Sequence, residues 1–265
     1  MGSTVILISY IFLVGAVFGS FLNVVLYRMR SGRSIMGRSS CGSCGKTLAP
    51  IDLIPILSYV FLNGRCRRCA SKISMQYPLV EALTGSLFVL SFVGATTYYE
   101  FALYILLSCT GVLIAVYDLR HTIIPVTFNY IFAILAFCMY LPRLIEGSVT
   151  PVIVLAGGVV HFCIFWFAWK VSKGRMLGYG DVLLIFGIGT LLGILPTFFA
   201  VWVACIVGSL YGITLIILSK LHEHVRGTKV TLTSQIPFGP FLLLGTVVVL
   251  VLQEPIAAFL LSLSN

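Results

Sequence analysis

Long apolar runs alternate with short polar segments along this chain of 265 residues. The runs cover residues 4–27, 78–95, 101–117, 123–142, 151–169, 182–195, 197–219 and 237–260. Each run is close to the ~20 residues that an α-helix needs to cross the ~30 Å hydrocarbon layer of a bilayer. The pattern predicts an all-α fold, a polytopic transmembrane bundle of about eight helices. The short run at 182–195 is expected to be tilted, extended into residues 178–181, or not fully spanning.

The composition agrees with a chain that is solvated mainly by lipid. Hydrophobic residues make up 59% of it and charged residues only 9%. The first apolar run differs from a secretory signal peptide, because Arg28 and Arg30 follow the run and no basic residue precedes it. We therefore interpret residues 1–27 as a retained first transmembrane helix.

The basic residues indicate the orientation. Of the 17 Lys and Arg residues, all except Arg143 fall in polar segments that eight helices place on one face of the membrane. Basic residues near helix ends accumulate on the cytoplasmic side. This predicts an N-terminus outside and a cytoplasmic loop at residues 28–77. The net charge of +9 then reflects topology and attraction to anionic membrane lipids, so we expect no nucleic-acid partner.

Two Cys-x-x-Cys pairs lie in the predicted cytoplasmic loop, at Cys41 and Cys44 and at Cys66 and Cys69. Two such pairs offer the four thiolates that structural zinc prefers, and a cytosolic location disfavours disulfides. The spacing predicts a small zinc-binding loop domain at 28–77, with a redox pair or a metal-free site as the alternatives. Residues 78–265 would form the transmembrane core.

Two of the three aspartates, Asp118 and Asp181, lie where apolar runs meet short polar segments on the predicted cytoplasmic face. Placing a carboxylate at a membrane boundary costs free energy, so a carboxylate found there is expected to have a function. Two adjacent carboxylates can act as general base and general acid in peptide hydrolysis. We expect Gly178 and Gly180 to let the backbone beside Asp181 leave helical geometry and approach a substrate closely.

Two other interpretations of the aspartates stay open. Asp181 could cap a helix N-terminus while Asp118 pairs with Arg120, so that neither is catalytic. Ion-coupled transporters also use carboxylates within the membrane, although no internal repeat is evident here.

The ordered motifs of the chain resemble those of type IV prepilin peptidases over almost its whole length. They are the cysteine pairs and residues 19–28, 52–58, 76–81, 118–125, 178–181 and 237–240. The resemblance implies an intramembrane aspartic protease that cleaves the basic leader of type IV prepilins or type II secretion pseudopilins after a glycine. It implies Asp118 and Asp181 as the catalytic pair, Gly178 and Gly180 in the active-site loop, and a location in the bacterial inner membrane.

Many members of this family also methylate the new N-terminal amine with S-adenosylmethionine, and the full cysteine loop is associated with that activity. The resemblance therefore implies zinc as a structural ion and S-adenosylmethionine as methyl donor. No sequence motif places the methyl-donor site, and a peptidase without methyltransferase activity is the alternative. Glu81 is expected to order the loop through an arginine or to bind a ligand, and residues 237–240 either line the active site or only start a helix.

Overall fold

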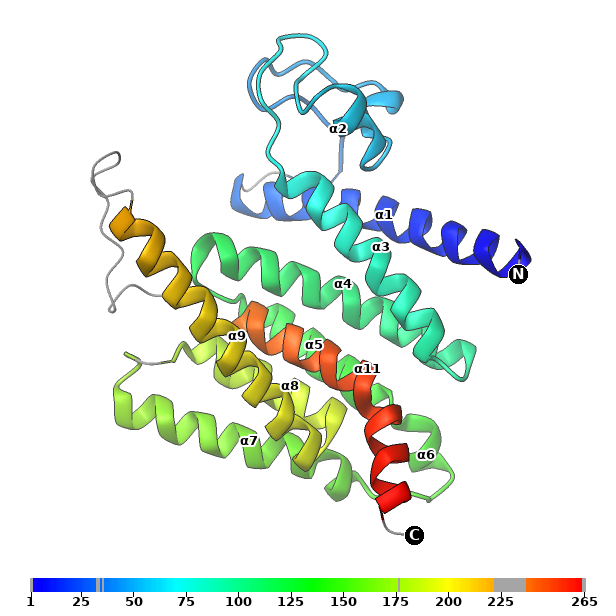
Figure 1. Cartoon of the computed structure of the whole chain (residues 1–265), viewed down its shortest axis with the longest axis vertical. Helices are drawn as coiled ribbons and strands as arrows, with labels where there is room; N and C mark the ends of the chain where they lie inside the picture. The colour runs from blue at the N-terminus through cyan, green and yellow to red at the C-terminus, as the bar shows by residue number, and fades with distance from the viewer. Residues whose placement is uncertain (1, 32–33, 35, 176, 222–236, 264–265) are drawn as a thin grey trace. The chain divides into compact units, whose positions relative to one another are not determined.

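The computed structural model describes residues 2–31, 34, 36–175, 177–221 and 237–263, and its secondary structure there is helical apart from two isolated β-bridges (Figure 1). The chain divides into two compact units, Met1–Leu113 and Ile114–Asn265. The expected division at residues 27 and 77 stays a prediction. Arg33, Arg226 and Lys229, which contribute to the predicted orientation, lie outside the described residues.

The first unit holds the N-terminal helices and the cysteine loop. Its elements are α1 (Gly2–Ser31), the 3-10 helix η1 (Pro50–Leu53), α2 (Leu57–Phe61), α3 (Gln76–Gly94) and most of α4 (Tyr98–His121). The second unit begins inside α4. It continues with α5 (Val126–Cys138), α6 (Leu141–Ile145), α7 (Pro151–Ser172), α8 (Tyr179–Leu192), α9 (Ile194–Leu221) and α11 (Gly239–Leu263).

Five helices, α1, α3, α4, α7 and α9, are long and apolar enough to cross a membrane, and α5, α8 and the described start of α11 are shorter apolar helices. Together they match the eight predicted runs, which confirms the helical bundle. The run at 123–142 is broken, because α5 ends at Cys138 and the short α6 follows it. At ~1.5 Å per residue, α5 and α8 are each shorter than the ~30 Å hydrocarbon layer.

Glycines bring α1 and α3 into close contact in the first unit. A Cβ on Gly19 would lie 2.7 Å from the Cα of Glu81, and one on Gly15 would lie 2.9 Å from the Cα of Gly85. Small residues four apart allow two helices in a membrane to approach backbone to backbone. This packing holds the end of α1 against Glu81, at the base of the cysteine loop.

Helix α8 occupies the centre of the second unit, where it packs against α5, α7, α9 and α11 (Figure 1). Ten of its residues, from Asp181 to Leu192, are buried. Contact with α7 depends on glycine, since a Cβ on Gly189 would lie 2.9 Å from the Cα of Gly158. A helix enclosed in this way carries Asp181 into the protein interior, away from lipid.

Candidate active site and metal site

Asp118 lies near the C-terminal end of α4 and is only 4% exposed. Its Oδ2 accepts a hydrogen bond of 3.0 Å from the backbone N–H of Gly239, the first residue of α11. A side chain at position 239 would collide with this carboxylate, because a Cβ there would lie 2.9 Å from Oδ2. The segment 237–240 therefore contains the start of α11 and also contacts Asp118, so it does more than start a helix.

Asp181 lies in the first turn of α8 and is 8% exposed. Its Oδ2 accepts a hydrogen bond of 3.2 Å from the backbone N–H of Gly178, the residue that caps the helix. Its Oδ1 is buried without a hydrogen-bond partner. Helix capping thus accounts for one oxygen of Asp181 and leaves the other available for chemistry.

The segments that carry the two carboxylates meet, since Gly180, next to Asp181, and Gly239, whose N–H donates to Asp118, both approach Ile124. Ile124 lies beside both segments. A Cβ on Gly180 would lie 2.8 Å from the Cβ of Ile124, and a Cβ on Gly239 would lie 2.9 Å from the Cδ1 of Ile124. Three segments that are far apart in the sequence therefore meet around Ile124. Within the described chain, Asp118 forms no ion pair with Arg120, so the alternative that pairs them is not supported.

Of the two glycines near Asp181, Gly178 leaves helical geometry as expected and Gly180 does not. Gly178 has extended backbone angles, φ −74° and ψ 146°, at the N-cap, but Gly180 lies inside the helix and neither has a positive φ. What position 180 requires is the absence of a Cβ, because α8 approaches Ile124 closely there. The backbone of Gly180 does not leave helical geometry.

Asn129 on α5 is a site residue that the sequence reasoning missed. It is 1% exposed, and its Nδ2 donates a hydrogen bond of 2.9 Å to the carbonyl oxygen of Gly180. Its Oδ1 is buried without a partner, as is the Oδ1 of Asp181. A buried amide costs free energy unless it is hydrogen-bonded, so an asparagine in an apolar run was the available signal. Asn129 anchors the turn that carries Asp181.

In the first unit, the structure brings Cys41, Cys44, Cys66 and Cys69 together, with all four sulfur atoms within 4.8 Å of one another. The Sγ atoms of Cys41 and Cys69 are 3.8 Å apart. Tetrahedral coordination with Zn–S bonds of about 2.3 Å places sulfur atoms about 3.8 Å apart. The four cysteines could hold a metal ion, and Cys109, Cys138, Cys163 and Cys205 lie outside this cluster.

The two cysteine pairs have the same backbone turn. The N–H of Gly45 donates to the carbonyl oxygen of Cys41 at 2.9 Å, and the N–H of Ala70 donates to that of Cys66 at 2.9 Å. Both turns end in the left-handed region, with φ of 70° at Gly45 and 55° at Ala70. Hydrogen bonds from the backbone of Cys44 and Ser43 lower the pKa of the Cys41 thiol to about 6. This favours the thiolate, which is the metal-binding form.

Glu81 contacts the cysteine loop through a backbone group, and it forms no ion pair with any arginine that the structure describes. Its Oε2 accepts a hydrogen bond of 2.7 Å from the N–H of Ile56, which has a φ of 61°. A positive φ is strained for a β-branched residue and persists only when the surroundings hold it. The loop's ion pair joins Arg67 Nε to Asp52 Oδ1 at 2.7 Å. Glu81 thus ties residues 50–61 to α3.

Comparison with known proteins gives a consistent result. Residues 13–95 match the family described as the bacterial peptidase A24 N-terminal domain, and residues 105–213 match the type IV leader peptidase family. The type 4 prepilin-like proteins leader peptide-processing enzyme of Escherichia coli O78:H11 is 34% identical, covering 90% of this chain and 91% of that protein.

Two further relatives carry the name prepilin leader peptidase/N-methyltransferase. The protein of Aeromonas salmonicida is 30% identical over 96% of this chain and 94% of its own length, and that of Bacillus subtilis is 27% identical over 97% and 99%. No solved structure matches the chain. These relatives favour a leader peptidase and give no support to a transporter.

Proposed function

Because the chain belongs to the type IV leader peptidase family, we propose that Asp118 and Asp181 are the catalytic pair with which it cleaves prepilin leaders. We further infer that cleavage follows a glycine at the cytoplasmic face of the inner membrane. The relatives' names support a second activity, N-methylation of the new N-terminal residue with S-adenosylmethionine as methyl donor. Prepilins or type II secretion pseudopilins are the substrates that this proposal assigns.

The observation that carries the peptidase proposal is that two distant segments, each with a buried carboxylate, meet around Ile124, and that one of these carboxylates has an unpartnered oxygen. In hydrolysis, the ionised carboxylate takes a proton from water as the water oxygen attacks the scissile carbonyl carbon. The protonated carboxyl donates its proton to the carbonyl oxygen, and the departing amine then receives a proton as the C–N bond breaks. Two like charges in one buried site favour this shared-proton state.

Each carboxylate keeps one oxygen oriented by a backbone N–H, that of Gly239 for Asp118 and that of Gly178 for Asp181. These hydrogen bonds fix the orientation of each carboxylate without adding a charge to the site. In the first unit, Cys41, Cys44, Cys66 and Cys69 would hold a structural zinc ion, which would contribute much of the free energy that folds the loop.

Replacement of either aspartate by asparagine tests the proposal, since the change preserves volume and hydrogen bonding but removes proton transfer. We expect Asp118→Asn and Asp181→Asn each to lower the rate of prepilin cleavage by at least about 100-fold. The measurement is leader removal from a prepilin by the purified, full-length protein. Glu146→Gln is the matched control, because Glu146 is exposed and outside the site, and it should cleave normally.

A variant of either aspartate that is inserted and folded, and still cleaves at the wild-type rate, would contradict the assignment. Insertion is checked by membrane fractionation and folding by the thermal unfolding midpoint. A loss of cleavage in Glu146→Gln of similar size would show that the assay responds to any lost carboxylate.

A further inference from the structure

The segment between the two cysteine pairs has an exposed apolar surface. Six of its large apolar side chains are exposed, and the most exposed is Phe61 at 80%. We call them the apolar surface of the cysteine loop: Ile51, Leu53, Ile54, Leu57, Val60 and Phe61. Within α2, Leu57, Val60 and Phe61 have the i, i+3 and i+4 spacing that places side chains on one face of a helix. An exposed apolar surface of this kind indicates contact with a protein or a membrane.

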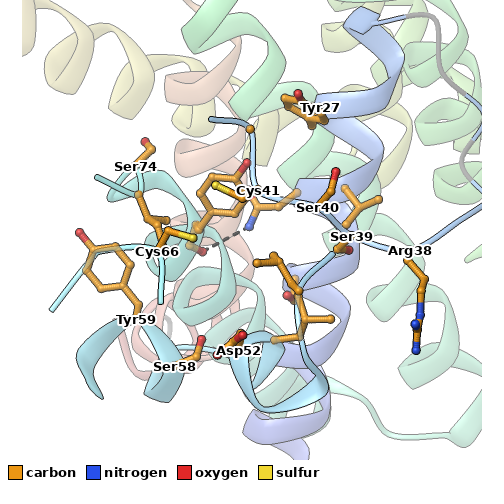
Figure 2. Close-up of a pocket in the computed structure, with 18 of the residues that line it drawn as sticks. Tyr27, Arg38, Ser39, Ser40, Cys41, Asp52, Ser58, Tyr59, Cys66 and Ser74 are labelled. Atoms are coloured by element: carbon orange, nitrogen blue, oxygen red, sulfur yellow. Dashed lines mark hydrogen bonds between the residues drawn. The ribbon is translucent and has the colours of Figure 1, made fainter. Parts of the chain in front are cut away.

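The other side of the same segment faces the protein. Asp52, Ser58 and Tyr59 line a cavity of about 520 Å³ within the first unit, and Tyr27 of α1 lies beside the same cavity (Figure 2). Of the six residues of the apolar surface, only Leu53 also lines this cavity. The segment is therefore amphipathic, with polar side chains on the side of the cavity and apolar side chains turned away from it.

The segment also lies beside the membrane-spanning parts of the first unit. The N–H of Ile56 donates a hydrogen bond of 2.7 Å to Oε2 of Glu81, which lies five residues inside α3. Helix α3 has 19 residues, about 28 Å at ~1.5 Å per residue, so it needs its whole length to cross the ~30 Å hydrocarbon layer. Glu81 then lies about 7.5 Å from the end of α3, inside that layer. This places the apolar surface, on both sides of Ile56, near the boundary between lipid headgroups and acyl chains.

Basic residues border the apolar surface. Residues 28–77 contain nine Lys and Arg residues and one acidic residue, Asp52, which forms an ion pair with Arg67. Arg65 directly follows the end of α2, where its N–H donates to the carbonyl oxygen of Leu62 at 3.0 Å, and a β-bridge places it beside Lys72. Both Arg65 and Lys72 are exposed. Basic side chains near a membrane are attracted to anionic headgroups, so the charge of this surface fits a bilayer that contains anionic phospholipid.

We propose that the apolar surface of the cysteine loop is inserted into the anionic leaflet at which α1 ends and α3 begins. Amphipathic segments that lie in a membrane interface bury their apolar face about 5–10 Å into the boundary between headgroups and acyl chains, which agrees with the depth of Glu81. The ion pair between Asp52 and Arg67 joins the inserted segment to the second cysteine turn, so insertion holds that turn at the membrane surface. The proposal does not depend on which reaction the chain catalyses.

Photocrosslinking identifies what covers the surface. The photoreactive amino acid p-benzoylphenylalanine is placed at position 61, where it replaces a phenylalanine, in the full-length protein reconstituted into vesicles with equal amounts of phosphatidylcholine and phosphatidylglycerol. After irradiation, mass spectrometry of the digested protein should find lipid adducts at position 61, with phosphatidylglycerol at least about twofold in excess.

Two positions calibrate the measurement. Ile6 is exposed on the membrane-spanning part of α1, so the same amino acid at position 6 should give lipid adducts. Lys46 is exposed on the first cysteine turn, and no large apolar side chain is exposed between residues 37 and 50. Position 46 should therefore give at least about tenfold fewer lipid adducts than position 61. The thermal unfolding midpoint shows whether each variant keeps its fold.

If the variant at position 61 unfolds early, the same replacement of Val60 decides the outcome, since Val60 lies on the same face of α2. Lipid adducts at position 6 without any at position 61 would overturn the proposal. Adducts that join position 61 to another segment of this chain or to a second copy would also overturn it, because the surface would then be a protein contact. Equal labelling of the two lipids would overturn the role given to the basic residues.

Discussion

At the scale of single residues, the aspartate site depends on positions that have no side chain. Gly180 and Gly239 allow α8 and α11 to approach Ile124 and Asp118 at distances that a Cβ would block. Catalysis is sensitive to such spacing, because a misplacement of about 1 Å can lower a rate about 100-fold. The two glycines therefore belong to the proposed active site as much as the carboxylates that would exchange protons.

Gly180→Ala should lower prepilin cleavage at least about tenfold, because its Cβ would lie 2.8 Å from that of Ile124 and must displace residues 118–125. The measurement is the cleavage rate with the same prepilin. Gly94→Ala is the matched control, since Gly94 also lies in a helix but has nothing within 4 Å of an added Cβ. Equal rates for both variants would mean that the contact with Ile124 has no role.

The catalytic candidates could be predicted because a carboxylate at a membrane boundary stands out energetically. Asn129 could not be identified as an anchor, since its role depends on a hydrogen bond to a residue 51 positions away, Gly180. The sequence likewise left open whether residues 237–240 line the active site or only start a helix, and it did not indicate the contact between Gly239 and Asp118. Such roles are decided by tertiary packing, which no local pattern in the sequence encodes.

At the scale of elements, the two cysteine turns share one backbone hydrogen bond but differ in the residue that follows the second cysteine. Gly45 adopts φ 70° without strain, whereas Ala70 adopts φ 55° in the equivalent place. For an L-residue the left-handed conformation costs about 1–2 kcal/mol. Glycine avoids this cost, but it has more conformational entropy in the unfolded chain, which offsets part of the advantage. The second turn is therefore the less stable of the two.

Opposite substitutions at these positions should have opposite effects. Ala70→Gly should stabilise the loop by about 0.5–1 kcal/mol, and Gly45→Ala should destabilise it by about 1 kcal/mol. Gly45 has open space around it, so the second effect comes from the backbone alone. Competition with a coloured zinc chelator measures both as changes in apparent metal affinity. A shift in the same direction for the two variants would contradict this account.

The sequence pattern located the helices better than it located their ends. It predicted an uninterrupted helix at 123–142, but the structure ends α5 at Cys138 and starts α6 after Tyr140. Hydropathy measures how apolar a run is and does not register where the backbone turns, so a break within apolar residues leaves little trace. The extension of α8 back to Tyr179 was one of three outcomes that the pattern left open.

At the scale of the whole molecule, the eight apolar helices combine with the one-sided basic residues to predict the orientation. An N-terminus outside places the cysteine loop and both aspartates in the cytoplasm and the segment around Arg143 outside. The number of helices could be predicted because each must bury its backbone polar groups within the bilayer. The boundary between the two compact units, inside α4, could not, because it depends on which helices pack together.

Fusions to alkaline phosphatase, which is active only outside the cytoplasm, test this orientation. A fusion after Gly147, between α6 and α7, should be active, and one after Gly174, between α7 and α8, should be inactive. The expected contrast follows from the basic residues Lys170, Lys173 and Arg175 beside the second site. The reverse pattern would place the aspartates outside and would exclude access to cytoplasmic leaders.

The enclosure of α8 by four helices also limits which amino-acid substitutions this protein can accept during evolution. A typical membrane helix has a lipid-facing side on which apolar residues exchange freely, but α8 is covered by protein along almost its whole length. A change in volume at any turn of α8 must be matched by a change on α5, α7, α9 or α11. The helix that carries Asp181 is therefore expected to change in evolution only together with the helices packed around it.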